Sequence, residues 1–356
     1  MSWVNHFCFL KLRQDESVSS KFGKLTSRLK KPFAKKAAIL QHMHMRQQII
    51  NFAKSLGFDL VGFSPSKIES KYLEAFDEWI EKGNEGEMSY MRKIEQRRDL
   101  TQILPGAKSV IVLALNYYRE QEDVKEGEGK VARYAYGRDY HKIITKKLKM
   151  LVKFLEEIAP EHKHRAYVDT GPILERALAE QAGIGVIGKN ACLITPEFGS
   201  WVFISEIITT LELAFEVAPS PFKIKTHPCG NCRKCIDACP TGAIIAPGVI
   251  DSRLCISYLT IENKDKIPPE LAEIIRKTKR LYGCDICQEV CPHNGAREKI
   301  TTHGELTMPK IAGSELNLDE VLAIKSSEDF LQKFAGSPVM RAKREGLARN
   351  AKVVKG

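Results

Sequence analysis

Eight of the ten cysteines lie between residues 229 and 291, and this crowding constrains the fold more than any other feature of the sequence. The segment CGNCRKCIDACP begins at Cys229 with the spacing Cys-x2-Cys-x2-Cys-x3-Cys-Pro, and CDICQEVCP repeats the second half of that pattern from Cys284. In this spacing three thiolates bind one iron–sulfur cube and the fourth binds a neighbouring cube. The pattern therefore predicts two 4Fe–4S clusters.

The ligand sets are expected to cross, because the x3 cysteine lies on the turn after its loop and faces the other cube. The first cluster is expected on Cys229, Cys232, Cys235 and Cys291, and the second on Cys239, Cys255, Cys284 and Cys287. Paired zinc sites are the alternative, since C-x2-C pairs also suit tetrahedral zinc. A zinc ribbon has no use for this dense, twice-repeated pattern ending in proline, and the crowding also disfavours disulfides.

Composition and hydropathy predict a folded protein without a membrane span. Hydrophobic residues make up 43% of the chain and charged residues 28%, as is ordinary for globular domains. No apolar run approaches the ~18 residues that a transmembrane helix needs, and the N-terminus lacks the apolar segment of a signal peptide. We therefore expect a cytoplasmic protein, and nothing in the sequence demands more than a monomer.

The net charge of +11 comes from the two ends of the chain. Residues 1–48 carry a charge of +8 and residues 340–356 one of +5, which leaves the residues between them near −2. Such ends are consistent with solvated tails and with phosphate-binding tails. Any nucleic-acid surface on the body of the protein must therefore be a local patch.

Hydrophobic periodicity predicts alternating helices and strands before the cysteine region. Helices are expected at 46–56, 72–82, 143–158 and 172–182, and strands at 58–63, 109–118, 166–169, 191–195 and 201–209. We interpret the chain as a basic extension (1–48), an α/β domain (49–225), a cluster-binding domain (226–300) and a helical C-terminal segment with a basic tail (301–356).

The glycine pattern Gly183-x-Gly185-x-x-Gly188 matches a nucleotide-binding motif by letter only. A dinucleotide-binding loop follows a strand and opens a helix, whereas this loop follows a predicted helix and leads into a strand. A phosphate-binding loop would need Ser or Thr where Asn190 stands. We reject both interpretations.

The segments VDTGPILER (168–176), GIGVIGKN (183–190) and ITPEFGS (194–200), followed by the cysteine motifs, resemble the epoxyqueuosine reductases. ARYAYGRDYH (132–141) and GEMSYM (86–91) are similar to further segments of that family, so the resemblance runs from about Arg46 to the C-terminus. It implies a nitroreductase-like cobalamin-binding domain, in the α+β or α/β class, followed by a ferredoxin-like domain with two clusters.

The resemblance also implies a reaction. Epoxyqueuosine at the wobble position of tRNA would become queuosine, with cob(I)alamin fed by the two clusters and two protons taken up. An external low-potential electron donor would supply the clusters. Asp139-Tyr-His141 begins like a histidine-supplying cobalamin motif, but Ile144 stands where glycine is needed. We therefore expect cobalamin without a protein histidine ligand.

Site residues follow from the matched segments. Asp169 is expected to be the proton donor, although a carboxylate between a strand and a helix is ordinarily an N-cap. A bound corrin and base would have to raise its pKa. Arg92, Asp169, Lys189, Asn190 and Leu193 are expected to contact cobalamin, and Arg176, Tyr134 and Ser257 to contact tRNA.

Structural alternatives exist for two of these residues, and functional alternatives for the whole chain. Arg176 also fits a surface ion pair with Glu180, and tyrosines spaced like Tyr134 also fit a core. A reductive dehalogenase would use the same cofactors on organohalides. A ferredoxin-type electron carrier would contain the clusters but no corrinoid.

Overall fold

The computed structural model describes residues 42–214, 217–222, 227–295, 297–307 and 312–356. Most of the predicted extension 1–48 lies outside the described residues, and residues 42–55 are helical. Residues 49–356 form one compact unit. Within the described ranges, no helix has both the length and the apolarity that a bilayer crossing requires.

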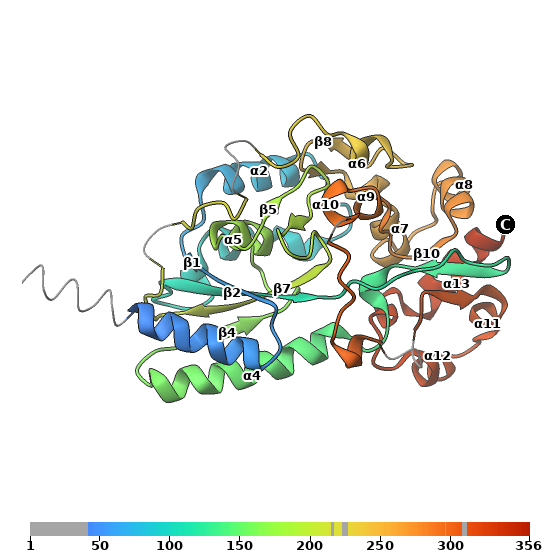
Figure 1. Cartoon of the computed structure of the whole chain (residues 1–356). Coiled ribbons are helices and arrows are strands. Elements are labelled where there is room, and N and C mark those ends of the chain that lie inside the picture. The colour runs from blue at the N-terminus through green and yellow to red at the C-terminus, as the bar shows by residue number, and fades with distance from the viewer. Residues whose placement is uncertain (1–41, 215–216, 223–226, 296, 308–311) are drawn as a thin grey trace, which may run out of the picture. The chain divides into compact units, whose positions relative to one another are not determined.

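A four-stranded sheet forms the centre of the N-terminal half of this unit, residues 49–214 (Figure 1). Its strands, in spatial order, are β1 (Leu60–Pro65), β2 (Ser109–Asn116), β7 (Val202–Thr209) and β4 (His164–Tyr167). Every residue of β2 is buried, as its continuous apolar sequence predicts. Because all three pairings are antiparallel, this part of the chain is α+β rather than a parallel α/β domain.

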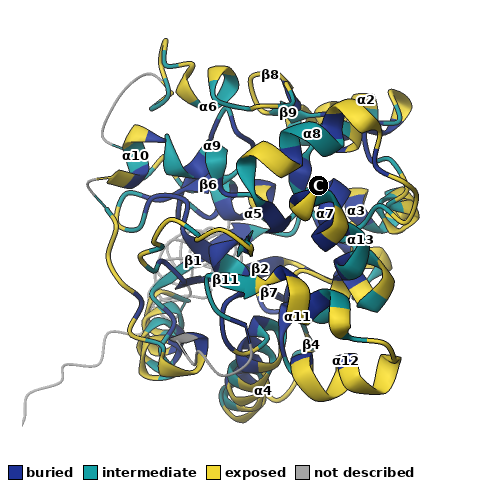
Figure 2. Ribbon diagram, turned by 90° about the vertical axis from the view of Figure 1, so that its right-hand side faces the viewer, coloured by how far each residue is buried: buried dark blue, intermediate teal, exposed yellow. Residues whose placement is uncertain are grey.

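Helices cover both faces of the sheet (Figure 1). On one side α4 (Tyr140–Ile158) packs against β4 and β7, and its Phe154 stacks on Phe52 with ring centroids 4.3 Å apart. On the other side α5 (Glu175–Gln181) packs against β1, β2 and β7. Also in this half are α2 (Ser70–Glu81) and α3 (Ile94–Arg98). Figure 2 shows the central strands buried and the outer surface of α4 exposed.

The predicted starts of two helices were wrong. α4 begins at Tyr140 rather than residue 143, because the Asp139 carboxylate caps it by accepting a hydrogen bond from the N–H of His141. α5 begins at Glu175 rather than Pro172, because residues 168–173 form bends. The residue before α5 is Leu174, so Asp169 is not the N-cap of this helix.

A second, smaller sheet combines segments from three of the predicted domains. β3 (Glu128–Val131) pairs in parallel with β10 (Arg280–Tyr282) and antiparallel with β11 (Glu315–Asn317). Around it pack α7 (Ile256–Ile261), α8 (Pro269–Thr278), α11 (Leu318–Ala323), α12 (Ser327–Phe334) and α13 (Lys343–Lys355). The cluster-binding segment thus shares a sheet and a core with the predicted domains on either side of it in the sequence. The domain boundaries at residues 225 and 300 stay predictions.

The cysteine loops lie among short elements. These are the hairpin of β5 (Val186–Ile187) and β6 (Leu193–Ile194), the hairpin of β8 (Ile244–Ala246) and β9 (Val249–Ile250), and the helices α6 (Lys234–Asp237), α9 (Ile286–Glu289) and α10 (Pro292–Gly295). The Gly183 loop joins α5 to β5. A Cβ atom at Gly185 would lie 2.7 Å from the carbonyl of Ile194, so this glycine serves hairpin packing.

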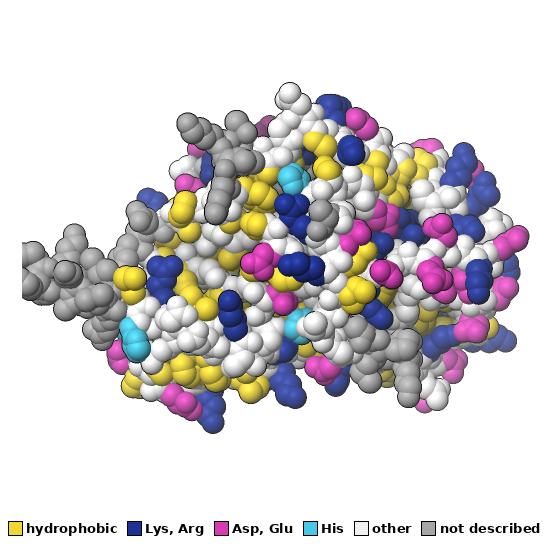
Figure 3. Space-filling model, viewed as in Figure 1, with side chains coloured by type: hydrophobic (Ala, Val, Ile, Leu, Met, Phe, Trp, Pro, Cys, Tyr) yellow, Lys and Arg dark blue, Asp and Glu magenta, His cyan; other side chains and the backbone are white. Residues whose placement is uncertain are grey.

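The predicted helical C-terminus is confirmed, and residues 343–355, expected as its basic tail, form the helix α13 and not a solvated tail. Leu347 and Ala351 on this helix are buried in the second core. Arg349 donates hydrogen bonds to the carbonyls of Leu259, Asn263 and Asp265, so part of the predicted tail charge is used inside the fold. On the face in Figure 3, basic and acidic side chains are interspersed over the described residues.

Replacing Leu347 by alanine tests the packing of this helix. The side chain is 0% exposed, so Leu347→Ala should lower the free energy of unfolding by about 2–5 kcal/mol. Urea denaturation should show a lower midpoint at an unchanged slope. Lys352→Ala, at an exposed position on the same helix, is the control and should have little effect. Equal midpoints for the two variants would contradict the packed helix.

Candidate active site and cluster centres

Four cysteines line one cavity between the β5–β6 hairpin and the cysteine loops. They are Cys229, Cys232, Cys235 and Cys291, which is the set expected for the first cluster. Ile194 also lines the cavity, and Val186 and Phe222 pack beside Cys291 and Cys229. The thiols therefore converge on a space with apolar walls, and the cavity draws one ligand from the second cysteine motif and three from the first.

The other four cysteines have a different environment. Cys255 and Cys284 pack against the second hydrophobic core. Burial, together with the proximity of Cys239, raises the pKa of Cys255, and burial also raises the pKa of Cys284 to about 12, with Cys255 adding to it. Thiols of the expected second set are thus close enough to raise one another's pKa.

The arrangement of the thiols bears on the zinc alternative. Four sulfurs bound to one zinc ion would each lie about 2.3 Å from a common point. Among the residues that the structure describes, no group of three His, Cys, Asp or Glu side chains is placed to hold a single ion in this way. Thiols that line a shared space without meeting at one point fit a cube better than an ion.

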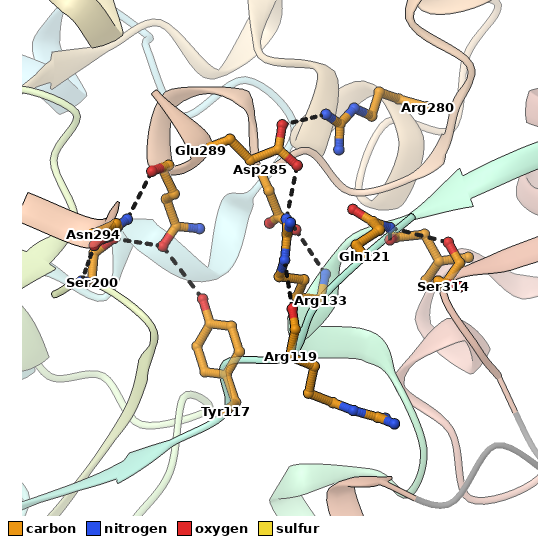
Figure 4. Close-up of polar contacts among 12 residues, drawn as sticks. Tyr117, Arg119, Gln121, Arg133, Ser200, Arg280, Asp285, Glu289, Asn294 and Ser314 are labelled. Carbon is orange, nitrogen blue, oxygen red and sulfur yellow. Dashed lines mark hydrogen bonds and ion pairs between the residues drawn. The ribbon is translucent and has the colours of Figure 1, made fainter. Parts of the chain in front are cut away.

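Buried polar contacts attach the second cysteine motif to the N-terminal half (Figure 4). The backbone N–H of Arg133 donates to Asp285 at 2.8 Å, and the Arg133 guanidinium binds Glu289 at 2.7 Å. Arg280 binds the other oxygen of Glu289 at 2.7 Å. Nearby, Gln288 accepts a hydrogen bond from Ser200, which in turn accepts one from Asn294. The cluster loops are therefore held in one position relative to the sheet.

Asp169 lies just after β4 with a left-handed backbone, φ 58°, which is rare outside glycine. Its carboxylate accepts a hydrogen bond from the Tyr140 hydroxyl at 2.7 Å and contacts His141 Nε2 at 3.2 Å. His141 Nδ1 lies 2.8 Å from Asp139, so both ring nitrogens are engaged. The Asp169 side chain remains 57% exposed, which leaves the held carboxylate open to a ligand.

The electrostatics of this group place a proton on His141. Burial acts to lower the pKa of His141, but the hydrogen bonds and charges of Asp139 and Asp169 raise it to about 9. Burial acts to raise the pKa of Asp169, but hydrogen bonds from His141 and Tyr140 outweigh it and bring the pKa below its ordinary value. At neutral pH the pair is an imidazolium beside a carboxylate. The protein's own groups thus act against the predicted rise in the pKa of Asp169.

Two of the predicted cobalamin contacts are used to hold the cluster loops. Lys189 donates to the carbonyls of Gly230 and Cys232 at 2.7 and 3.0 Å, and Asn190 donates to the carbonyl of Cys287 at 3.4 Å. Leu193 is buried in the sheet–helix core. Arg92 is exposed and pairs with Glu85. The other four predicted residues thus have partners away from the Asp169 carboxylate, and all five cobalamin contacts stay predictions.

Of the predicted tRNA contacts, Tyr134 lies near the Asp169 site, with its ring centroid 6.3 Å from that of Tyr140. Arg176 donates to the carbonyl of Ala191 in the β5–β6 turn, while Glu180 accepts from the N–H of Ile187, so the alternative ion pair between them does not form. Tyr134 is partly buried against the second core, and Ser257 is partly exposed on α7.

Several residues around Asp169 were missed by sequence reasoning. Arg341, whose charge lowers the pKa of Asp169, binds Glu262 at 2.9 and 3.0 Å and lies 5.7 Å from the ring of Tyr90. It was counted only as part of the tail charge. Glu175 was quoted in the VDTGPILER segment without a role. Glu206 was given no role because it lies within a strand of mostly apolar residues. Tyr140 lies in the segment ARYAYGRDYH quoted for the resemblance, but its contact with Asp169 was not predicted.

Comparisons with known proteins agree with this site. The family described as "Epoxyqueuosine reductase QueG, DUF1730" matches residues 97–170, and the "4Fe-4S double cluster binding domain" matches residues 228–294. Epoxyqueuosine reductase from Gloeobacter violaceus is 43% identical over 86% of this chain and 94% of its own length. The enzyme of that name from Pseudomonas aeruginosa is 37% identical over 87% and 84%.

The chain belongs to the epoxyqueuosine reductase family.

Solved structures support the same assignment. Epoxyqueuosine reductase from Bacillus subtilis superimposes with a TM-score of 0.78 at 33% identity, over 88% of this chain and 81% of that one. The enzyme of that name from Streptococcus thermophilus does so with a TM-score of 0.75 at 30% identity, over 87% and 80%. As a member of this family the chain is an oxidoreductase with a 4Fe–4S double-cluster domain. The electron-carrier alternative was wrong.

The pKa of His141 predicts how stability depends on pH. Because the pKa rises from an ordinary 6.5 to about 9 on folding, the ion pair stabilises the fold fully below pH 6.5 and not at all above about 9. The melting temperature of the wild type should therefore fall across this range relative to that of His141→Gln. The control Lys142→Gln, at the exposed next position, should keep the wild-type dependence. Parallel curves for wild type and His141→Gln would refute the pairing.

Proposed function

We propose that the protein reduces epoxyqueuosine to queuosine at the wobble position of tRNA, with cobalamin and two 4Fe–4S clusters as its cofactors. The observation that carries the proposal is the exposed Asp169 carboxylate, held by Tyr140 and His141 in the same compact unit as the cysteine cavity. A solved epoxyqueuosine reductase bound to a modified tRNA-Tyr stem loop matches this chain with a TM-score of 0.79 at 33% identity. This favours an anticodon stem-loop as the substrate.

The contacts of His141 support cobalamin bound without a protein histidine ligand. Both nitrogens of His141, the histidine in the candidate motif, are engaged by Asp139 and Asp169. Arg92 and Asp169 are exposed enough to contact a corrinoid. Contacts of Lys189, Asn190 and Leu193 with it are proposed from the family resemblance, and Asn190 and Leu193 are buried in this structure. When bound, cobalamin supplies the strong nucleophile or low-potential electrons that cleavage of a carbon–oxygen bond needs.

The side chains of the protein supply protons to the reaction. Removing the epoxide oxygen as water takes up two electrons and two protons. The proton on His141 can move to Asp169 across their 3.2 Å contact as negative charge develops on the departing oxygen. Tyr140 holds the carboxylate in place during this transfer. Arg176, Tyr134 and Ser257 are proposed to contact the tRNA, and an external low-potential donor to reduce the clusters.

The decisive experiment is mass spectrometry of tRNA nucleosides after incubation with protein, cobalamin and a strong reductant. Queuosine should replace epoxyqueuosine. Asp169→Asn should keep both clusters and bound cobalamin but lower turnover by at least about 10²-fold, because the amide cannot relay a proton. Asp319→Asn, at an exposed position on α11, is the control. Wild-type turnover in Asp169→Asn would exclude its role, and an unchanged substrate with wild-type protein would exclude the function.

The crossed ligand sets are also a proposal, supported by the cavity that joins Cys291 to the first motif. Cys232→Ser and Cys291→Ser should remove the same electron paramagnetic resonance signal and leave about four irons per chain. Cys239→Ser should remove the other signal, although Cys239 belongs to the first motif. Cys8→Ser is the control and should keep both signals. If Cys239→Ser and Cys232→Ser lose the same signal, the sets are not crossed.

A further inference from the structure

A second acidic group lies in the central sheet, beside the strand that leads to Asp169. Glu206 occupies the middle of β7 and is 0% exposed. Neither of its carboxylate oxygens has a hydrogen-bond partner. An unpaired ionised carboxylate in such a place is very unfavourable, so the group stays neutral by keeping a proton. An apolar side chain would pack in this strand without that cost, so packing alone does not explain the presence of an acid here.

The surroundings of Glu206 connect it to the site. On the sheet its neighbours are Val112 of β2 and Tyr167 of β4, neither of which brings a full charge. The charges of Glu175, which lies on α5, and of Asp169 both act on the Glu206 carboxyl. Both are acidic, so they add to the effect of burial and hold the pKa of Glu206 well above its ordinary value.

Glu175 binds the backbone of Asp169 and acts on Glu206 through its charge. Its carboxylate oxygen accepts a hydrogen bond from the backbone N–H of Asp169 at 2.8 Å. Burial and the charge of Asp169 raise the pKa of Glu175 to about 8, although Arg176 and Arg97 act in the opposite direction. Glu175 is therefore mostly protonated at neutral pH, and it can release its proton within a narrow range above neutrality.

We propose that Glu206 and Glu175 form a buried proton store that resupplies Asp169 during reduction of the substrate. The inference rests on the proposed function, in which two carbon–oxygen bonds break, a carbon–carbon double bond forms and the oxygen leaves as water. Two electrons come from the external low-potential donor through the clusters. One proton comes from His141 and the second from the two glutamates, and both reach the oxygen through Asp169. Neither glutamate touches the substrate.

Infrared difference spectroscopy of the protein without added cobalamin or tRNA tests the store directly. Raising the pH through about 8 should remove the carbonyl band of a neutral carboxylic acid in the wild type. Glu206→Gln and Glu175→Gln should each alter that band. Glu212→Gln, at an exposed position after β7, is the matched control and should leave it unchanged. Absence of a neutral-acid band in the wild type would overturn the store.

Turnover on epoxyqueuosine-containing tRNA tests the use of the store. Glu206→Gln should lower kcat by roughly tenfold or more at an unchanged KM, since the amide keeps the shape but releases no proton. Glu206→Asp should recover part of kcat. If Glu206→Gln does not fold, Glu175→Gln provides the test in its place. The kcat of Glu175→Gln should then no longer change with pH near 8, as that of the wild type does. Unchanged kcat in the folded variants would overturn the inference. An inactive wild type would instead overturn the proposed function.

Discussion

The attachment of the second cysteine motif to the sheet is the constraint on which the rest of the molecule depends. The 4Fe–4S double-cluster domain draws its cysteines from two motifs that lie far apart in the chain. Arg133 follows β3, whereas Asp285 and Glu289 flank the cysteines of the second motif. Removing one partner from such a buried ion pair leaves an uncompensated charge and costs about 3–5 kcal/mol. The contacts thus fix the position of the cluster loops, and the small sheet of β3, β10 and β11 fixes it a second time.

Asp169, the proposed proton donor, has a strained backbone. A left-handed backbone is unfavourable for a residue with a Cβ atom, though aspartate tolerates it better than most. Such conformations persist only where the surroundings hold them, and they concentrate at active sites. Here Tyr140 holds the side chain and Glu175 holds the backbone N–H. The carboxylate is thereby kept at the surface instead of turning back to cap α5.

Local patterns in the sequence predicted much of this arrangement, and long-range contacts account for what they missed. The cysteine spacing predicted a cavity-forming set that includes Cys291, because thiolates on tight loops have few ways to surround a cube. The buried strand β2 followed from its apolar run. The antiparallel pairing, the packing of α13 and the approach of Arg341 to Asp169 depend on segments far apart in the chain, which periodicity does not report. Glu206 was missed because one acid does not alter the pattern of an apolar strand.

The two faces of the Asp169 carboxylate have different proton chemistry, and this follows from solvent access. His141 is 31% exposed and is paired with two carboxylates, so it can recover a proton from water. Glu206 is sealed between the sheet and α5 and interacts with acids, so its proton is kept by burial. A reaction that takes up two protons at one oxygen benefits from both arrangements. The first proton can come from a cation that stabilises the carboxylate, and the second from a neutral acid that is already buried inside the protein.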